Sequence, residues 1–552
     1  RLVPLIQAQA AELDLADAEP QWEQPESTIA ALVDRVHEYE TTLIPHGLHV
    51  VGRAPSQEER LDYLSALLDD TPEERRPSVD ALNHLMKRGS VEEALVMDGL
   101  ERTAENLEVL RRLCHADRHL SEDAELEAIV RALDGGFISP APGGDLLHNP
   151  EILPTGRNMH GFDPFRLPTT FATKEGARQA ALLLDRHRAD GNGLPETIAM
   201  VLWGTDNLKS GGAPIGQALA LMGARPRMDS YGRLCGAELI PLEELGRPRI
   251  DVVMTLSGIF RDLFPHQIRL LAEAAFFAAS ADEPIEQNFI RRNALEHMER
   301  EGCDVETASL RVFSNADGAY GSNVNLLVDS STFTDEDELA EAYERRKSFA
   351  YGRSGKPSRQ TGVLQGALAK VELAYQNLES VELGVTTIDQ YFDTLGGIGR
   401  AVRRASGSDV PVYISDQTRG DGTVRTLTEQ VSLESRTRML NPKWYEAMLS
   451  HGAEGVRNIE AHVTNTMGWS ATTGQVDPWI YKQITETFVL DPELRERMAK
   501  LNPKASAKLA NRLLEAHERD YWQPDNDMLE RLREAGDELE DRLEGINDGV
   551  AA

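Results

Sequence analysis

The sequence predicts a mixed α/β fold: a helical amino-terminal segment, a central α/β domain with a mostly parallel sheet, and a helical carboxyl-terminal domain. Apolar residues recur at helical spacing through residues 28–44 and 91–116. Between residues 177 and 281, short apolar runs alternate with helical patterns, which is typical of a parallel sheet covered by helices. Helical patterns continue after residue 430. These observations predict domains at residues 1–135, 136–430 and 431–552.

Length and composition limit the class of protein. A chain of 552 residues exceeds one hydrophobic core and predicts about two to four domains. The net charge of −33 repels nucleic acid and anionic lipid, so neither is expected as a partner. No apolar run is long enough to span a membrane, and the three cysteines are widely spaced, which favours a reducing compartment. Because the chain starts at Arg1 rather than Met, it is either processed or a fragment, and we expect a fragment that continues an upstream region.

The predicted elements follow in order along the chain. The Gly- and Pro-rich stretch 134–164 separates the first helices from the α/β pattern. Apolar strands are predicted up to Trp203-Gly204, at Val252–Leu256 and within residues 409–419. Helices are predicted at residues 177–190, 213–229, 266–281 and 335–352. Pairs of an N-capping residue and Pro predict later helix starts at Asn441-Pro442, Asp477-Pro478, Asp491-Pro492 and Asn502-Pro503.

Several familiar nucleotide-binding and hydrolase motifs do not occur. The sequence has no Walker A loop, no GxGxxG after a strand and no HExxH, so we do not expect ATP or a dinucleotide on a glycine-rich phosphate loop. No Gly-x-Ser-x-Gly elbow stands at a strand exit. Ligands of open α/β sheets bind beyond the carboxyl ends of strands, here at residues 203–212 and 256–264.

The first candidate site is the loop PTGRNMHGFDP at residues 154–164. It places Arg157, Asn158, His160 and Asp163 on a backbone that Pro and Gly restrict. Imidazole and carboxylate groups three residues apart can bind a divalent metal or transfer a proton. The alternative is a capped turn, with Asp163 in an Asx-turn and Arg157 in a surface ion pair. Spacing alone favours the capped turn.

A second candidate, WGTDNLKSGG at residues 203–212, leaves a buried strand. Trp203 can stack on a flat ligand, and Asp206 and Lys209 can place charges beside it. The alternative is a helix start capped by Thr205 or Asp206, with Trp203 in the core. The residues leave both interpretations open.

Two further stretches carry polar groups. EPIEQNFIRRN at residues 283–293 contains Glu286, although acidic residues are also common at the start of a helix. SNADGAYGSNVN at residues 314–325 offers Asp317 and Asn323 among glycines that permit tight turns. A polar loop without a function needs fewer hydrogen-bonding groups.

The stretch HVTNTMGWSATTGQVDPW at residues 462–479 combines Met-Gly-Trp with a run of hydroxyl side chains. This composition predicts a break in a helix. Trp469 is then either a ligand contact or a core anchor at a helix–helix turn. Together these stretches suggest a cleft for a large, flat, partly apolar ligand with a polar rim.

The same strings resemble the carboxyl-terminal half of the large, porphyrin-binding subunits of the CobN/magnesium chelatase family. The resemblance runs from about residue 30 to the end of the chain and also includes ELIPLEELGRPRIDVVMTLSGIFRDLFP, NPKWYEAM and EAHERDYW. In the related aerobic cobaltochelatase subunits, the His of the first string is absent and WGTDN is altered. His160 and Asp206-Asn207 therefore favour magnesium chelatase.

The resemblance implies an ATP-dependent ligase that inserts Mg²⁺ into protoporphyrin IX, both as substrates, in bacteriochlorophyll or chlorophyll biosynthesis. ATP would be hydrolysed by AAA+ partner subunits of the I and D type, which agrees with the missing Walker A loop. The implied location is the bacterial cytoplasm, or the plastid stroma in a plant or alga. A family motif with a Glu assigned to metal insertion is absent and would lie upstream, so we expect that this chain does not chelate alone.

The resemblance also implies a porphyrin cleft lined by residues 155–163, 203–212, 286–288, 315–325 and 462–470. Catalytic roles are expected for His160, Asp163 and Glu286. Substrate contacts are expected for Arg157, Asn158, Trp203, Asp206, Lys209, Asp317, Asn323 and Trp469, while the metal ligands are not indicated. The alternatives are the large subunit of aerobic cobaltochelatase, in cobalamin biosynthesis, and a non-catalytic porphyrin carrier or scaffold.

Overall fold

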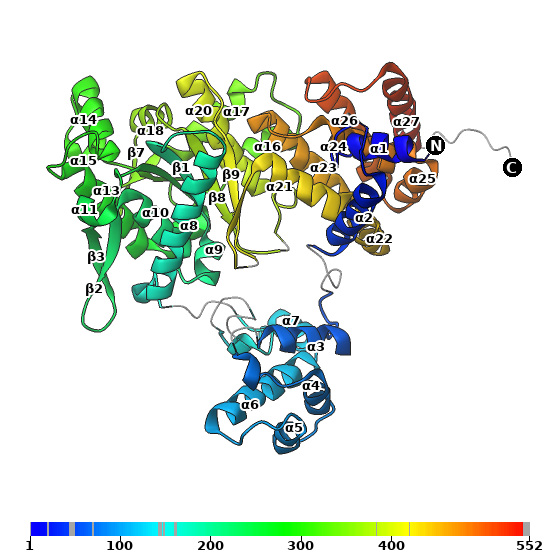
Figure 1. Ribbon diagram of the computed structural model, residues 1–552. Helices are drawn as coiled ribbons and strands as arrows, with labels where there is room; N and C mark the ends of the chain where they lie inside the picture. The colour runs from blue at the N-terminus through cyan, green and yellow to red at the C-terminus, as the bar shows by residue number, and fades with distance from the viewer. Residues whose placement is uncertain are drawn as a thin grey trace. The chain divides into compact units, whose positions relative to one another are not determined.

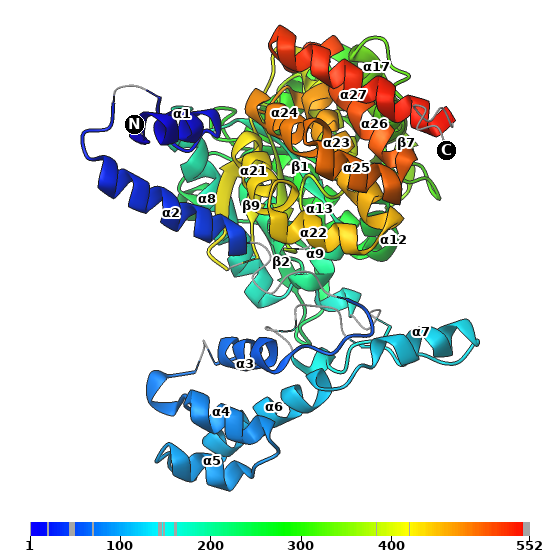
Figure 2. The ribbon, with the colours of Figure 1, turned by 90° about the vertical axis from the view of Figure 1, so that its right-hand side faces the viewer.

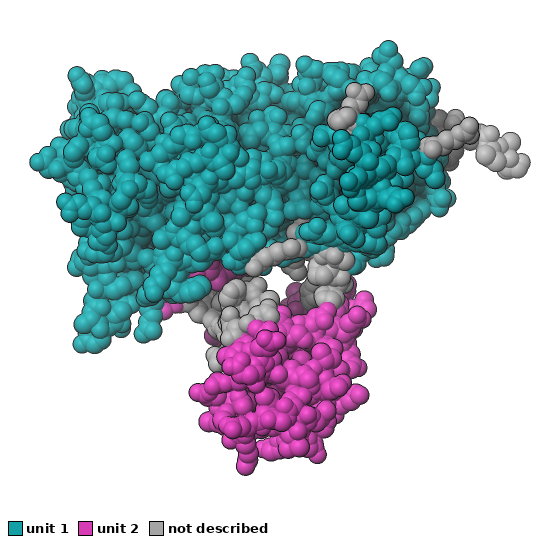
Figure 3. Space-filling model, in the orientation of Figure 1, with its two compact units in different colours: residues 1–47, 164–207, 212–552 teal, residues 48–163, 208–211 magenta. Residues whose placement is uncertain are grey.

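The computed structural model describes residues 2–18, 21–42, 50–68, 71–141, 146, 150–158, 163–381, 383–418 and 420–544. The chain forms two compact units (Figure 3). Unit 1 comprises Arg1–Gly47, Pro164–Asn207 and Gly212–Ala552, and unit 2 comprises Leu48–Asp163 and Leu208–Gly211. This division differs from the predicted domains, because the first and the last helices belong to the same unit as the sheet.

Unit 1 is built on an eight-stranded sheet in the order β10-β9-β8-β1-β4-β5-β6-β7. The parallel strands are β1 (Thr197–Leu202), β4 (Asp251–Leu256), β5 (Val312–Ser314), β8 (Leu373–Leu378) and β9 (Val412–Asp416). Antiparallel strands close the two edges, namely β6 (Phe349–Tyr351), β7 (Pro357–Arg359) and β10 (Thr423–Thr426). Every residue of β1, β4, β8 and β9 is buried, so the sheet is covered on both faces. The predicted α/β class with a mostly parallel sheet is confirmed.

Helices cover the sheet in two groups (Figure 1). One group is α8 (Thr170–Ala189), α10 (Ala213–Met222) and α13 (Pro265–Ser280). The other is α17 (Asp337–Lys347), α18 (Thr361–Leu368), α20 (Gly397–Ser406) and the π-helical turn η4 (Phe392–Gly396). Shorter connections are η3 (Pro164–Arg166), α9 (Gly204–Lys209), α11 (Leu242–Leu245), α12 (Gly258–Leu263), α14 (Phe289–Glu301), α15 (Val305–Ala308), α16 (Val324–Asp329) and α19 (Asp389–Tyr391).

Two predicted helices are shorter than expected because each runs into a strand. α10 ends at Met222, where Gly223 takes a left-handed φ of 70°, and the chain continues into the hairpin of β2 (Ala224–Met228) and β3 (Leu234–Leu239). α17 ends at Lys347 and leads into β6. Short edge strands of this kind lack the apolar run that reveals a buried strand.

The carboxyl-terminal helices form a layer of unit 1 (Figure 1 and Figure 2). They are α21 (Leu427–Glu434), η5 (Ser435–Met439), α22 (Pro442–Ser450), α23 (Ala453–Thr473), α24 (Pro478–Ile484), η6 (Thr485–Leu490), α25 (Pro492–Leu501), α26 (Pro503–Glu518) and α27 (Asn526–Glu544). The four predicted Pro starts are confirmed in α22, α24, α25 and α26. α23 is largely buried and contacts η4, α16 and α20, which joins this layer to the α/β part.

The first helices, α1 (Val3–Glu12) and α2 (Pro25–Thr41), pack against that same layer. Arg436 of η5 donates a hydrogen bond to the carbonyl oxygen of Leu13 at 2.6 Å. Lys482 of α24 forms an ion pair with Glu12. The helices α1 and α2 therefore belong to unit 1, whereas the helices that follow them in the chain belong to unit 2.

Unit 2 is helical and has a core of its own. Its elements are α3 (Gln57–Ala66), η1 (Glu73–Arg75), α4 (Val79–Met86), α5 (Val91–Met97), α6 (Ala104–Leu120), α7 (Glu125–Leu133) and η2 (Pro150–Ile152). Leu64, Leu82, Leu95 and Leu110 are among its buried core residues. The predicted helix 91–116 is two helices, α5 and α6. Within the described residues of the chain, no helix has the length and apolar character needed to cross a membrane.

Candidate functional site

A cavity of unit 1 lies beyond the carboxyl ends of β1, β4, β5 and β8. Its volume is about 490 Å³, in the range of small-molecule sites. The chain passes from β1 to β4 and β5 on one side and later returns to β8 on the other side, so the strand order reverses here. Ligands of open α/β sheets bind at such switch points. The lining residues are Trp203, Gly204, Thr205, Ser257, Gly258, Ile259, Tyr320, Gly321, Asn323, Asn325, Leu326, Lys347, Leu383, Ile388, Gln390, Tyr391 and Thr394.

Trp203 and Tyr391 form an aromatic wall of the cavity. Trp203 follows β1, and its Nε1 donates a hydrogen bond to Oε1 of Gln376 in β8 at 3.0 Å. The ring centroid of Tyr391, from α19, lies 5.1 Å from that of Trp203. Burial raises the pKa of Tyr391 well above its ordinary value, so the phenol stays neutral. Two tilted π faces held this way suit a flat ligand.

Lys347, the last residue of α17, brings a positive charge to the cavity. Its residue exposure is only 1%. Its Nζ donates to the carbonyl oxygen of Leu256 at 3.2 Å and to Oδ1 of Asn315 at 2.8 Å, where β4 and β5 end. Burial lowers the pKa of Lys347 to about 8. The ammonium form therefore still predominates near neutral pH.

Asp393 of η4 holds the loop that follows β5. Its carboxylate accepts hydrogen bonds from the backbone N–H groups of Ser322 at 2.6 Å, Val324 at 2.8 Å and Asn325 at 3.2 Å. Asn323 turns the backbone with a φ of 65°, a conformation that Asn tolerates better than most residues. Burial raises the pKa of Asp393 although these hydrogen bonds favour the charged form. The Asp393 side chain thus fixes the loop that forms this wall of the cavity.

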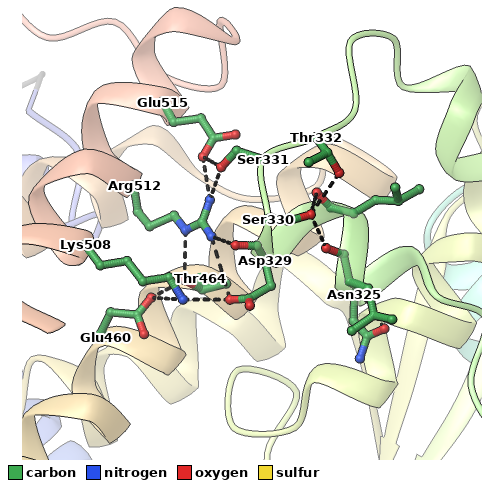
Figure 4. Close-up of polar contacts among 12 residues, drawn as sticks. Asn325, Asp329, Ser330, Ser331, Thr332, Glu460, Thr464, Lys508, Arg512 and Glu515 are labelled. Carbon is green, nitrogen blue, oxygen red and sulfur yellow. Dashed lines mark hydrogen bonds and ion pairs between the residues drawn. The ribbon is translucent and has the colours of Figure 1, made fainter. Parts of the chain in front are cut away.

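The other end of α16 is held by basic side chains of α26 (Figure 4). Lys508 Nζ donates to Oδ1 of Asp329 at 2.7 Å. Arg512 donates to the carbonyl oxygen of Asp329, to Oγ of Ser331 at 2.5 Å and to Oε2 of Glu515 at 2.6 Å. Because the first turn of α16 lines the cavity, this network connects the cavity to the carboxyl-terminal helices.

Tyr320 covers the exit of β4. Its ring lies against Gly258, where an added Cβ would stand 2.1 Å from a ring carbon. Its hydroxyl donates a hydrogen bond to Asp262. Arg261 donates to the carbonyl oxygen of Ala319 at 2.8 Å. These contacts tie the loop after β5 to α12, and a side chain at position 258 would displace the Tyr320 ring.

Two of the predicted substrate contacts, Trp203 and Asn323, line the cavity. Asp206 is buried in α9, close enough to Tyr391 to contribute to the raised pKa of that phenol. Asp317 is exposed on the loop after β5 and does not line the cavity. Lys209 is half-buried at the end of α9. Only part of each predicted stretch therefore faces the cavity.

The expectation that residues 286–288 line the same cleft is wrong. The backbone of Asn288 forms a parallel bridge with Arg249, which precedes β4. Residues 286–288 therefore lie at the amino end of the sheet, opposite to the cavity, and Glu286 is exposed there. Asn288 accepts the backbone N–H of Arg291 at 2.9 Å and caps α14, so the helix-start interpretation explains this stretch.

The predicted break at residues 462–479 is also wrong over most of its length, because α23 runs on to Thr473. The hydroxyls of Thr466 and Thr472 donate to carbonyl oxygens one turn earlier, which keeps them inside the helix. Gly468 lets the ring of Phe392 pack on the helix. Trp469 is completely buried and donates from Nε1 to a backbone carbonyl at 2.8 Å, so residues 462–470 form core and line no cleft.

The loop at residues 154–164 lies in unit 2 except for Pro164, which belongs to unit 1. Arg157 donates from Nη2 to the carbonyl oxygen of Ile152 at 2.7 Å, so its side chain supports its own loop. Asn158 is exposed, and its backbone pairs with the segment before the loop. Asp163 is exposed, and His160 lies outside the described residues. The catalytic role expected for His160 and Asp163 stays a prediction.

Sequence reasoning missed Lys347, Tyr391 and Asp393. Lys347 lies at the end of an ordinary amphipathic pattern, and nothing local marks it as buried. A signal does exist beside Asp393, because DTLGGIG at residues 393–399 places three glycines in a helical pattern that glycine weakens. Gly396 and Gly397 in this run approach Thr472 and Tyr343 closely, which explains them. Among the side chains that the structure describes, no group of three or more His, Cys, Asp or Glu residues is arranged to hold a metal ion.

Comparison with known proteins gives the family. The family model described as CobN/Magnesium Chelatase matches residues 1–529. The chain belongs to the CobN/magnesium chelatase family. The H-type magnesium-chelatase subunit of Rhodobacter capsulatus is 60% identical over 94% of this chain and 40% of its own length. That of Cereibacter sphaeroides is 57% identical over 98% of this chain and 41% of its own length.

Relatives that are named as cobaltochelatase subunits are less similar to this chain than the two H-type subunits are. Aerobic cobaltochelatase subunit CobN of a Sinorhizobium species is 35% identical over 73% of this chain and 32% of its own length. The solved catalytic subunit of cobaltochelatase from Mycobacterium tuberculosis has a TM-score of 0.81 and 31% identity, over 97% of this chain and 48% of that one. The chain spans about 40% of the length of the two H-type relatives that it matches.

Proposed function

We propose that this chain supplies a porphyrin-binding part of a magnesium chelatase, which inserts Mg²⁺ into protoporphyrin IX in the cytoplasm for (bacterio)chlorophyll synthesis. The observation that carries the proposal is the cavity at the switch point of the sheet, with Trp203 and Tyr391 as its aromatic wall. The 60% identity to an H-type magnesium-chelatase subunit supports magnesium as the metal. A flat tetrapyrrole ring can lie against this wall, where its faces are shielded from water.

Metal insertion poses two physical problems for the whole enzyme. Mg²⁺ holds its waters tightly and prefers six oxygen ligands, while the porphyrin presents nitrogens that must lose two protons. The contribution we assign to the described residues is to bind and orient the ring. His160 and Asp163 remain our candidates for polar contacts near the ring or the metal route. We propose no contact with the ring for Glu286 or Trp469, because neither residue lies at the cavity.

The energy for insertion comes, in this proposal, from ATP hydrolysed by AAA+ partner subunits of the I and D type. This chain lacks a glycine-rich phosphate loop in its sequence, which is consistent with ATP binding elsewhere. We expect no chelation by the chain alone. Formation of magnesium protoporphyrin by the isolated chain, followed by its fluorescence emission, would contradict this expectation.

Cobaltochelatase is the second candidate, because a cobaltochelatase subunit shares the fold with a TM-score of 0.81. The identities of 60% against 35% favour magnesium. Supplying the complete complex with Co²⁺ and hydrogenobyrinate diamide, and separately with Mg²⁺ and protoporphyrin IX, decides between them. Turnover of the cobalt pair alone would replace the magnesium assignment.

Porphyrin binding by this chain tests the proposal directly. Titration with deuteroporphyrin IX should quench tryptophan fluorescence saturably. Trp203→Ala should weaken binding about threefold to tenfold, because an aromatic contact is worth about 0.5–1.5 kcal/mol. The matched control is Trp22→Ala, since Trp22 does not line the cavity. Equal loss in both variants, or no binding by the wild-type chain, would contradict the proposal.

A further inference from the structure

The cavity differs in charge from the rest of the chain. The chain has 91 acidic and 58 basic residues. Among the described residues that line the cavity, however, Lys347 carries the only formal charge, and none is acidic. A positively charged interior in an acidic protein selects against cations and for anionic ligands.

Lys347 has hydrogen-bonding capacity that its protein partners leave unused. An ammonium group has three N–H donors, and two of them reach Leu256 and Asn315. In the part of the chain that the structure describes, the hydrogen bonds of Lys347 go to a carbonyl and an amide oxygen and not to a carboxylate. Buried charges are rarely left without a partner of opposite sign.

The charges around Lys347 do not cancel it. Asp393 attracts it from η4, while Arg261 of α12 and Arg346 of α17 repel it. The carboxylate of Asp393 is already occupied by backbone N–H groups of the loop after β5. Arg346 has a buried Nε without a hydrogen-bond acceptor. Arg261 is itself paired with Asp262, so Lys347 and Arg346 together face Asp393, and the local balance is positive at the edge of the cavity.

We propose that Lys347 binds a carboxylate group of the tetrapyrrole, so that the cavity recognises the free acid and orients the ring by its acidic edge. This inference rests on the proposed porphyrin binding and adds the group that is recognised. The aromatic wall of Trp203 and Tyr391 holds the ring, and Lys347 sets its direction. The same charge disfavours Mg²⁺ next to Lys347.

The wild-type chain provides the first test. Deuteroporphyrin IX carries propionate carboxylates, and its dimethyl ester is of similar shape without the charges. Both are titrated into the chain in the same detergent buffer, with fluorescence quenching as the readout. The free acid should bind about tenfold to hundredfold more tightly, as expected for a hydrogen bond to a charged group in a buried site.

The variant Lys347→Met assigns the preference to one residue. It keeps the length of the side chain and removes the charge, so the ratio of the free-acid affinity to the ester affinity should fall to about one. Lys500→Met is the matched control, because Lys500 is exposed on α25 and pairs only with Glu496. Thermal unfolding of each variant reports on folding, and the wild-type comparison stands if Lys347→Met does not fold.

The outcomes separate this inference from the proposed function. Equal binding of acid and ester by the wild-type chain overturns the inference and leaves porphyrin binding in place. A folded Lys347→Met chain that still prefers the acid overturns the assignment to Lys347. Failure of both porphyrins to bind removes the proposed function and the inference together.

Discussion

At the scale of single residues, His462 shows what burial does to a titratable group. It lies inside α23, and its ring centroid is 4.7 Å from that of Trp444 in an edge-on arrangement. Burial, with a smaller contribution from Arg438, lowers the pKa of His462 from 6.5 to about 3. The folded chain therefore keeps this imidazole neutral at pH values where the unfolded chain binds a proton.

His462 should therefore make the protein sensitive to mild acid. Between pH 6.5 and about 3 the unfolded state binds more protons, so the free energy of unfolding falls as the pH falls. From pH 7 to pH 5 the loss from this one group is about 2 kcal/mol. Urea unfolding at the two pH values measures it. Between these two pH values the His462→Gln variant should lose about 2 kcal/mol less free energy of unfolding than the wild-type protein. The control His37→Gln, at an exposed site, should lose as much as the wild-type protein.

At the scale of elements, α16 is positioned by its partners rather than by its own stability. It has six residues, and a helix this short does not persist alone in water. Asp393 holds its amino end, while Lys508 and Arg512 hold the residue at its carboxyl end. The position of this cavity wall therefore depends on contacts from η4 and α26.

Replacement of Arg512 should loosen that wall. Arg512 is buried and donates hydrogen bonds to Asp329, Ser331 and Glu515, although Glu515 also keeps an ion pair with Arg519. Arg512→Met leaves the acceptors on Asp329 and Ser331 without this donor and should cost about 1–3 kcal/mol of stability. Hydrogen exchange should become faster in residues 322–331, and porphyrin affinity should fall. The control Arg497→Met removes an exposed pair with Glu446 and should change neither. Unchanged exchange in residues 322–331 would show that α16 is held in another way.

At the scale of the whole molecule, the chain consists of two units with separate cores. The core of unit 2 is built from leucines of α3, α4, α5 and α6, whereas that of unit 1 is built around β1, β4 and α23. Compact units with hydrophobic cores of their own can unfold separately. The stability of the sheet therefore should not depend on the packing of unit 2.

A cavity in the core of unit 2 tests this independence. Leu82 is 1% exposed, and Leu82→Ala should lower the free energy of unfolding of unit 2 by about 2–5 kcal/mol. Hydrogen exchange should become faster across α4 and α6 and stay unchanged in β1 and β4. Leu133→Ala, at an exposed site of α7, is the matched control. An equal increase of exchange in β1 and β4 would mean that the two units unfold together.

Local patterns predicted much of the fold correctly. The Asn-Pro and Asp-Pro pairs mark real helix starts, because an N-capping side chain and a residue without N–H both suit the first turn. The apolar runs of β1 and β4 marked buried strands, and their exits marked one wall of the cavity. β8 was missed because Gln376 and Asn377 interrupt its apolar run, although both are buried.

The sequence by itself determined the α/β class, most helix starts, the strand exit at Trp203 and, through long strings in order, the family. Only the tertiary structure decided which polar groups meet. Lys347, Asp393 and Tyr391 come from three distant elements, and no spacing along the chain encodes their approach. Burial likewise cannot be seen in a string: Trp469 and Glu286 both lie in polar stretches, yet one is core and the other is exposed at the opposite end of the sheet. A chain pattern reports local conformation, whereas a site depends on packing between elements.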